Sequence, residues 1–174
     1  MRPYILAIDP GTEQSGICLT RTEDYKPLRF GKIHNELILS WLYENDVPLA
    51  STEAVIERMQ GNSFSVGESV FLTCEWIGTF KVYLANLSIP YSFIYRREEY
   101  KQICGNIYTR NDKGITDALV DRFCPYGTAK TKAKGTKANP GWFYGFSKDV
   151  WQAYAQSVAY IDIQKEKKDD TCSD

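Results

Sequence analysis

The sequence predicts an α/β domain in which helices flank one mixed β-sheet. Three short apolar runs, at residues 3–9, 15–20 and 28–33, follow one another closely, which predicts an antiparallel meander. Two later apolar runs, at 53–59 and 90–95, are separated from the meander and from each other by helical patterns, which predicts strands added in parallel. The order of the elements therefore predicts a mixed five-stranded sheet.

Apolar residues at helical spacing define the helices between and after these strands. One pattern covers residues 34–46, and a broader apolar face predicts a longer helix over about 66–87 with Ser65 as its N-cap. The segment NDKGITDALVDRF begins at Asn111 and SKDVWQAYAQSVAYID begins at Ser147, both residue types that favour helix starts. We therefore expect two more helices, the second of them near the C-terminal end.

Length and composition favour a single soluble domain. The chain has 174 residues, of which 43% are hydrophobic and 25% charged, and these are ordinary values for a globular protein. It contains no uncharged apolar stretch of about 18 residues, so we expect no membrane span. We assign the domain to residues 1–162 and expect residues 163–174 to form a flexible tail.

The cysteines and the histidine argue against a zinc site. The five cysteines form no C-x-x-C pair, and His34 is the single histidine. The odd number and irregular spacing of the cysteines indicate reduced thiols, which predicts a cytoplasmic protein.

Basic residues are unevenly distributed, although the net charge is only −1. Residues 125–148 contain lysines and no acidic residue, and further basic residues lie between Arg96 and Lys113. Such a region on a nearly neutral protein predicts a surface that binds a polyanion. The run TAKTKAKGTKANPGW can be a solvated loop or a set of phosphate contacts, and the overlapping WFYGF can stack on bases or pack in the core.

Three acidic residues stand in apolar segments. Asp9 ends the strand of ILAIDPG, Glu57 lies near the end of the strand of AVIERMQ, and Asp149 falls in the first turn of the last helix. If the two strands are parallel neighbours, Asp9 and Glu57 leave the sheet at the same edge. Carboxylates that lie close together repel one another unless a cation sits among them, and oxygen ligands favour Mg²⁺, for which Mn²⁺ can substitute.

Each of these carboxylates also has a purely structural interpretation. Asp9 can be a turn residue before Pro-Gly, Glu57 can form a salt bridge as part of a Glu-Arg pair, and Asp149 can interact with the helix dipole. All three acids stand in apolar segments, and this shared position and their order along the chain favour a common site instead.

The three segments AIDPGTEQSG, VIERMQ and DVWQAYAQSVAY, in this order, resemble the RuvC family of Holliday-junction resolvases, and more specifically its small bacteriophage members. The segment REEYKQICGNIYTRNDKGITDALVDRF resembles the basic region that precedes the last helix of the family. The resemblance covers about residues 4–162. It implies an RNase H-like fold, a homodimer, and an endonuclease that cuts branched DNA with two divalent metals held by four acidic groups.

The resemblance also assigns roles to residues of this chain. It implies that Asp9, Glu57 and Asp149 are catalytic metal ligands, and Gln152 stands where the family has its fourth acid. Gln152 is i+3 from Asp149, so it points to the same side of the helix, but its neutral carbonyl predicts a weaker second metal site. Lys101 and Lys113 match the region of the catalytic lysines, although solvated surface lysines would look the same. The implied DNA-contacting residues are Arg58, Arg96, Arg97, Lys101, Arg110, Lys113, Lys130, Lys132, Lys134 and Lys137.

Two features bear on selectivity and assembly. The family places an aromatic wedge just after the strand glutamate, and here Phe64 is the nearest aromatic residue, which predicts weaker selectivity for branched structure. Two symmetric cuts require two sites, and Trp76, Phe80 and Tyr83 on the long helix are candidates for a dimer interface or for ordinary core packing.

The sequence predicts a Mg²⁺-dependent crossover junction endodeoxyribonuclease that acts on phage recombination or replication intermediates in the host cytoplasm, with no membrane or small-molecule partner. Cleavage of forks and flaps stays open. Three alternatives are a non-catalytic branched-DNA-binding protein, because Gln152 breaks the acidic set, a ribonuclease H, and a phosphotransferase of the actin and sugar-kinase superfamily. The short single copy of the fold argues against the phosphotransferase.

Overall fold

Five strands form one mixed sheet in the order β3-β2-β1-β4-β5. The computed structural model describes residues 1–60, 67–124 and 133–171. Strands β1, β2 and β3 pair antiparallel, whereas β4 and β5 are added parallel to β1, which confirms the predicted architecture. The strands are β1 (Tyr4–Asp9), β2 (Gln14–Arg21), β3 (Pro27–His34), β4 (Thr52–Glu57) and β5 (Tyr91–Ile94).

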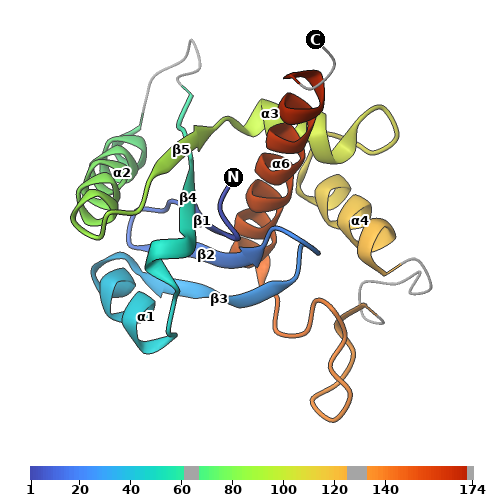
Figure 1. Cartoon of the computed structure of the whole chain (residues 1–174), viewed down its shortest axis with the longest axis horizontal. Helices are drawn as coiled ribbons and strands as arrows, with labels where there is room; N and C mark the ends of the chain where they lie inside the picture. The colour runs from blue at the N-terminus through green and yellow to red at the C-terminus, as the bar shows by residue number, and fades with distance from the viewer. Residues whose placement is uncertain (61–66, 125–132, 172–174) are drawn as a thin grey trace.

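Helices cover both faces of this sheet. In Figure 1, α1 and α2 lie on one side, and α3, α4 and α6 lie on the other. Each face has its own hydrophobic core. The helices are η1 (Asn35–Leu37), α1 (Ile38–Glu44), η2 (Leu49–Ser51), α2 (Glu68–Asn86), α3 (Arg96–Cys104), α4 (Asp112–Phe123) and α6 (Lys148–Thr171).

The alternation of side chains along β1 decides which way Asp9 faces. Leu6 and Ile8 belong to the core under α1 and α2, whereas Ile5 and Ala7 belong to the core under α6. Because side chains alternate with a period of two along a strand, Asp9 continues the α6 face. The same alternation along β4 puts Glu57 on that face, since Val55 belongs to the α6 core.

Helix α6 packs closely across strand β2. The buried hydroxyls of Thr20 on β2 and Ser157 on α6 are hydrogen-bonded at 2.7 Å. Near the start of the helix, a Cβ atom on Gly16 would lie 2.4 Å from the backbone carbonyl oxygen of Asp149. Only a residue without a side chain allows this approach, so Gly16 fixes where the first turn of α6 rests on the sheet.

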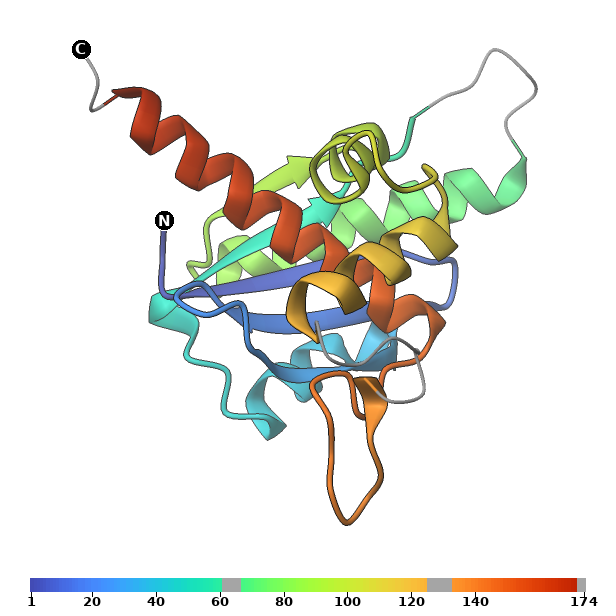
Figure 2. The same ribbon diagram turned by 90° about the vertical axis from the view of Figure 1, so that its right-hand side faces the viewer.

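Residues 133–146 form an extended loop that projects away from the sheet (Figure 2). A single bridge pairs Gly135 with Pro140, and the loop is anchored by Phe143 and Phe146, which are buried. The Trp142 ring stacks on a ring of α4, that of Phe123, at 5.3 Å between centroids. For these rings the core-packing interpretation of WFYGF is confirmed.

Several local expectations have clear outcomes. The side chain of Asn111 accepts a hydrogen bond from the Gly114 amide at 2.9 Å, which confirms Asn111 as the N-cap of α4. Phe80 is buried in the core, which confirms the core-packing alternative for this residue. Helix α6 continues to Thr171, past the residue at which the tail was expected to begin. Ser65 lies outside the described residues. Among the described helices, none is long and apolar enough to cross a membrane.

Replacing Gly16 tests the contact between α6 and β2. We expect Gly16→Ala to lower the free energy of unfolding by about 1–3 kcal/mol, because the added methyl group must displace the helix start. Urea denaturation measures this change. The matched control is Gly78→Ala in α2, where a Cβ meets no atom within 4 Å. This control should stabilise the chain by about 0.5–1 kcal/mol. A Gly16→Ala chain as stable as the wild type would contradict the packing described.

Replacing Phe143 tests the anchor of the projecting loop. We expect Phe143→Ala to cost about 3–5 kcal/mol of unfolding free energy, because it leaves a cavity among buried rings. Tyr144→Ala is the control, since Tyr144 is 40% exposed on the same loop. It should change stability by less than about 0.5 kcal/mol. Equal effects of the two substitutions in thermal denaturation would be incompatible with this anchor.

Candidate active site

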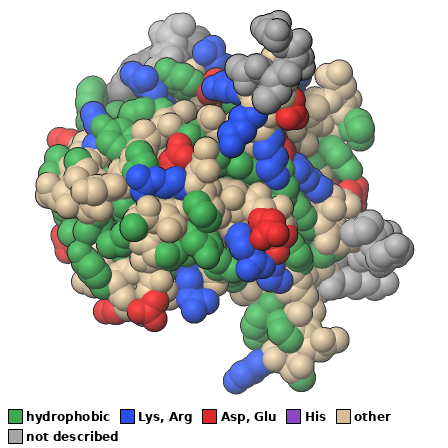
Figure 3. Space-filling view, in the orientation of Figure 1, with side chains coloured by type: hydrophobic (Ala, Val, Ile, Leu, Met, Phe, Trp, Pro, Cys, Tyr) green, Lys and Arg blue, Asp and Glu red, His purple; other side chains and the backbone are tan. Residues whose placement is uncertain are grey.

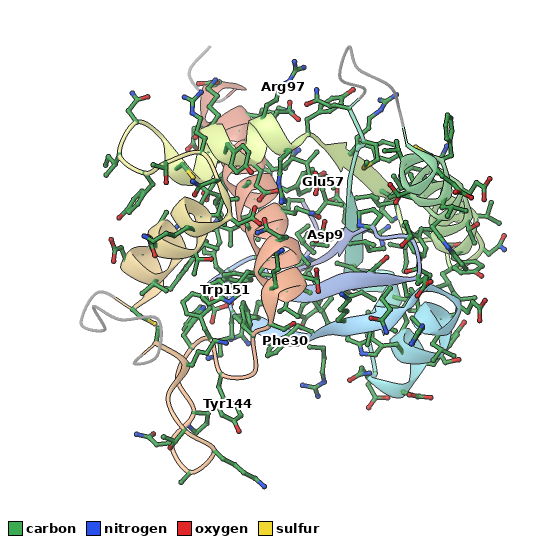
Figure 4. The ribbon with its side chains drawn as sticks, turned by 180° about the vertical axis from the view of Figure 1, so that it is seen from behind. Asp9, Phe30, Glu57, Arg97, Tyr144 and Trp151 are labelled. Atoms are coloured by element: carbon green, nitrogen blue, oxygen red, sulfur yellow. The ribbon has the colours of Figure 1, made fainter. Side chains whose placement is uncertain are left out.

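Asp9 and Glu57 meet at one edge of the sheet, as the sequence predicts. Ile8 of β1 pairs in parallel with Ile56 of β4, so the two acids follow neighbouring positions on adjacent strands. Figure 4 shows Asp9 and Glu57 close together beside α6. The side-chain amide nitrogen of Gln156 lies 3.5 Å from Oδ1 of Asp9 and 3.2 Å from Oε2 of Glu57.

Gln156 is a site residue that the sequence reasoning missed. It lies on the same helix as Asp149 and Gln152, at positions i+7 and i+4 relative to them, and therefore on the same helix face. That periodicity was the available signal. Gln156 is fully buried, and its Oε1 atom accepts no hydrogen bond from any residue that the structure describes. The Oε1 atom of buried Gln152 is likewise without a hydrogen-bond partner among those residues.

Burial and mutual repulsion shape the electrostatics of the carboxylate pair. Burial, followed by the negative charge of Glu57, raises the pKa of Asp9 well above its ordinary value. The charge of Asp149 raises the pKa of Asp9 further, and Arg96 opposes these effects. The site therefore has an excess of negative charge that attracts cations.

Arg96, which the sequence predicts to contact DNA, is partly buried beside the carboxylates. Its guanidinium group lies 3.4 Å from Glu57, 3.6 Å from Glu99 and 3.3 Å from Asp112. Burial acts to lower the pKa of Arg96, but Glu99 and Glu57 outweigh it and the pKa is raised. Glu99 is fully buried, and burial raises its pKa well above the ordinary value. The sequence reasoning gave Glu99 no role.

Asp149 is paired with a lysine, although it lies near enough to Asp9 to raise its pKa. It forms an ion pair with Lys32 of β3 at 3.0 Å, at the β2–β3 side of the sheet. Across residues 1–60, 67–124 and 133–171, no three His, Cys, Asp or Glu side chains form a group that could hold a metal ion. The structure therefore brings together two of the three predicted carboxylates, with a glutamine between them and the third held by a lysine.

The donor set nevertheless fits one hard divalent cation. Asp9 and Glu57 supply carboxylate oxygens, and the amide of Gln156 can present its carbonyl oxygen, which has no hydrogen-bond partner among the described residues. Oxygen donors of this kind suit Mg²⁺ or Mn²⁺. For a second cation, Asp149 is already paired with a lysine, and Gln152 offers a neutral amide. Asp112 and Asp117 line the cavity beside Gln152, but they are paired with Arg96 and Lys113.

The basic candidates fall into two groups. A cavity of about 550 Å³ beside Gln152 has three lysines in its wall, and it lies between α4, the start of α6 and the projecting loop. Within it, Lys113 is paired with Asp117 at 2.5 Å. A second cavity of about 450 Å³ lies at α3 and the segment after it. The basic residues of the first cavity are Lys113, Lys134 and Lys148, and those of the second are Arg97, Lys101 and Arg110.

The other basic candidates are scattered. The guanidinium group of Arg58 lies over the ring of Phe93 at 5.4 Å. Lys137 is exposed on the projecting loop, which stands out from the body in Figure 3. Lys130, Lys132 and the wedge candidate Phe64 lie outside the described residues.

Among the solved structures similar to this chain are Holliday-junction resolvases. A Thermus thermophilus RuvC structure matches with a TM-score of 0.67 at 11% identity, covering 94% of this chain and 96% of that chain. The T. thermophilus RuvC in complex with Holliday junction substrate matches with a TM-score of 0.62 at 11% identity, covering 90% and 91%. The yeast mitochondrial Holliday junction resolvase Ydc2 matches with a TM-score of 0.61 at 13% identity, covering 94% and 80%.

No protein-family sequence model and no curated protein sequence matches the chain. The structural likeness establishes that the chain has the mixed-sheet, RNase H-like fold of RuvC.

Adding a carboxylate at Gln156 tests whether this position faces a cation site. We expect Gln156→Glu to tighten Mn²⁺ binding by about tenfold or more, because it adds a negative oxygen ligand beside Asp9 and Glu57. Without metal the same variant should unfold at a lower temperature, since three carboxylates would repel. Gln164→Glu makes the same change farther along α6 and should alter neither quantity. Unchanged Mn²⁺ affinity in Gln156→Glu, measured by isothermal titration calorimetry, would contradict the assignment.

Proposed function

We propose that this chain is a structure-selective endonuclease that cuts branched DNA, with four-way junctions as its main substrate. The observation that carries the proposal is the meeting of Asp9 and Glu57 at the ends of parallel strands, under α6, in the fold of RuvC. One similar structure is a RuvC bound to a Holliday junction substrate. We extend the proposal to phage recombination or replication intermediates because of the sequence resemblance to bacteriophage resolvases.

In this proposal Asp9, Glu57 and Gln156 hold a Mg²⁺ ion, for which Mn²⁺ can substitute. Such a cation supplies charge stabilisation to a phosphodiester under attack by water. Asp149 and Gln152 are the remaining candidates for a second, weaker position. The low access of water to Asp9 and Glu57 strengthens their interaction with any cation that enters.

The two basic cavities supply the DNA contacts of the proposal. Phosphate oxygens bind lysine and arginine without regard to sequence, so this part of the interaction weakens with salt. The lysine-lined cavity lies next to Gln152 and is the candidate path for the cut strand. Lys101 and Lys113 are the candidates for contact beside the scissile phosphate, one in each cavity.

A homodimer completes the proposal, because resolution of a junction needs two cuts related by symmetry. Helix α2 exposes large apolar side chains, which suit an interface between two copies of this chain. They are Phe71, Leu72 and Val82. Trp76 and Tyr83 are partly buried against the core and contribute at most their outer edges.

A second candidate function is binding of branched DNA without cleavage. Glutamines stand at two positions of the helix face that points toward the site, and the third position, Asp149, is paired with Lys32. These features reduce the negative charge available to divalent cations. They leave the basic cavities intact.

A synthetic four-way junction distinguishes the two functions. We expect the wild-type chain to make paired incisions in Mg²⁺ or Mn²⁺, seen on a denaturing gel. Asp9→Asn should bind the junction normally, but it should cut at least about 100-fold more slowly, because a proposed ligand of the cation is lost. Glu44→Gln, which changes an exposed acid of α1, should cut like the wild type. Junction binding without incision in either metal would reject the nuclease in favour of the binding protein, and loss of both would reject the two proposals.

A further inference from the structure

Arg96 and Glu99 form an ion pair that the proposed function does not use. Both residues lie in the first turns of α3 at i,i+3 spacing, directly after β5. Arg96 is 27% exposed in its side chain and Glu99 is 0% exposed. The guanidinium group of Arg96 faces the candidate active site, where it pairs with Glu57.

Glu99 is buried beside the guanidinium group of Arg96. Removing a carboxylate from water is costly unless a positive charge compensates it, and burial raises the pKa of Glu99. Neither oxygen of Glu99 accepts a hydrogen bond from a described residue, and the guanidinium group of Arg96 lies 3.6 Å away. Arg96 is the group that most opposes the effect of burial on the pKa of Glu99, so the two side chains are electrostatically coupled.

Arg96 in turn reaches the carboxylate pair. Its Nη1 atom lies 3.4 Å from Oε2 of Glu57, and this is the same oxygen to which Gln156 donates at 3.2 Å. The guanidinium group thus lies next to Glu57, one of the two carboxylates that are proposed to hold a cation. Glu99 lies 3.6 Å from the same Nη1 atom, and Asp112 lies 3.3 Å from the Nη2 atom.

We propose that Arg96 takes the place of a second divalent cation, and that Glu99 is the positioning residue that turns it inward. The site then binds one divalent cation, and the arginine supplies a further positive charge beside the same carboxylates. This account agrees with the neutral Gln152 and with the pairing of Asp149 to Lys32, since both reduce the ligands left for a second cation. The proposal rests on the proposed function only in that Asp9 and Glu57 bind a divalent cation.

Mn²⁺ binding to the DNA-free, full-length chain tests this arrangement. We expect one Mn²⁺ per wild-type chain by isothermal titration calorimetry. Arg96→Gln should bind Mn²⁺ about tenfold more tightly or take up a second ion, because the competing charge is gone. Glu99→Gln should also tighten Mn²⁺ binding, though less than Arg96→Gln, because Arg96 is then no longer held beside Glu57. A merely structural role of the pair would lower the thermal stability of both variants without tightening Mn²⁺ binding.

Arg97→Gln is the matched control. The side chain of Arg97 lies over the ring of Tyr95, and Figure 4 shows it away from Asp9 and Glu57. This variant should bind Mn²⁺ like the wild type. Thermal denaturation of each variant verifies that it is folded. Two Mn²⁺ ions on the wild-type chain would overturn the inference, as would wild-type affinity in a folded Arg96→Gln chain.

The outcome is separable from that of the junction assay. If the wild type binds no Mn²⁺, the shared premise of a cation at Asp9 and Glu57 fails, and both the inference and the Mg²⁺-dependent nuclease are rejected. If the wild type binds one Mn²⁺ and both variants bind it more tightly, yet the wild type does not cut junctions, the inference stands and the nuclease falls. If the wild type cuts junctions but neither variant binds Mn²⁺ more tightly, the nuclease stands and the inference falls.

Discussion

The parallel pairing of β1 with β4 is the constraint on which the rest of the site depends. Because Ile8 lies opposite Ile56, the acids that follow these residues leave the sheet side by side. The alternation of the strands then puts both on the face covered by α6. A shift of one residue in this register would move one carboxylate to the opposite face, away from its partner. The hydrophobic cores on the two faces oppose such a shift, since each buried side chain of β4 would then have to fit into the core of the opposite face.

Helix α6 completes the site because it is held at short distance from the sheet. Gly16 lets its first turn approach β2, and the hydroxyl pair of Thr20 and Ser157 fixes it farther along. With 3.6 residues per turn, the polar face of α6 presents side chains along a line across the sheet. That line begins near β3, where Asp149 meets Lys32, and reaches β1 and β4 at Gln156.

Side chains of the protein supply part of the positive charge of the site. Arg96 lies among three carboxylates, and Lys32 pairs with a fourth. The negative charge that remains at Asp9 and Glu57 attracts cations. This chain thus combines the fold of RuvC with a carboxylate pair, Asp9 and Glu57, whose negative charge is partly neutralised by Arg96. One cavity with three lysines in its wall lies beside Gln152, and a second, with two arginines and one lysine, lies at α3 and the segment after it.

The sequence by itself determined the order of the elements, the mixed sheet, and the meeting of Asp9 with Glu57. These follow from local periodicity and from the rule that parallel neighbours end at the same edge. Only the tertiary structure decided the partners of the polar side chains. Helical spacing puts Gln156 on the face of Asp149 and Gln152, but only packing shows that it contacts Asp9 and Glu57. The sequence likewise does not show that Glu99 is buried or that Arg96 pairs with it and with Glu57. Such partners depend on how α3 and α6 pack on the sheet, and sequence spacing within one element cannot specify contacts between elements.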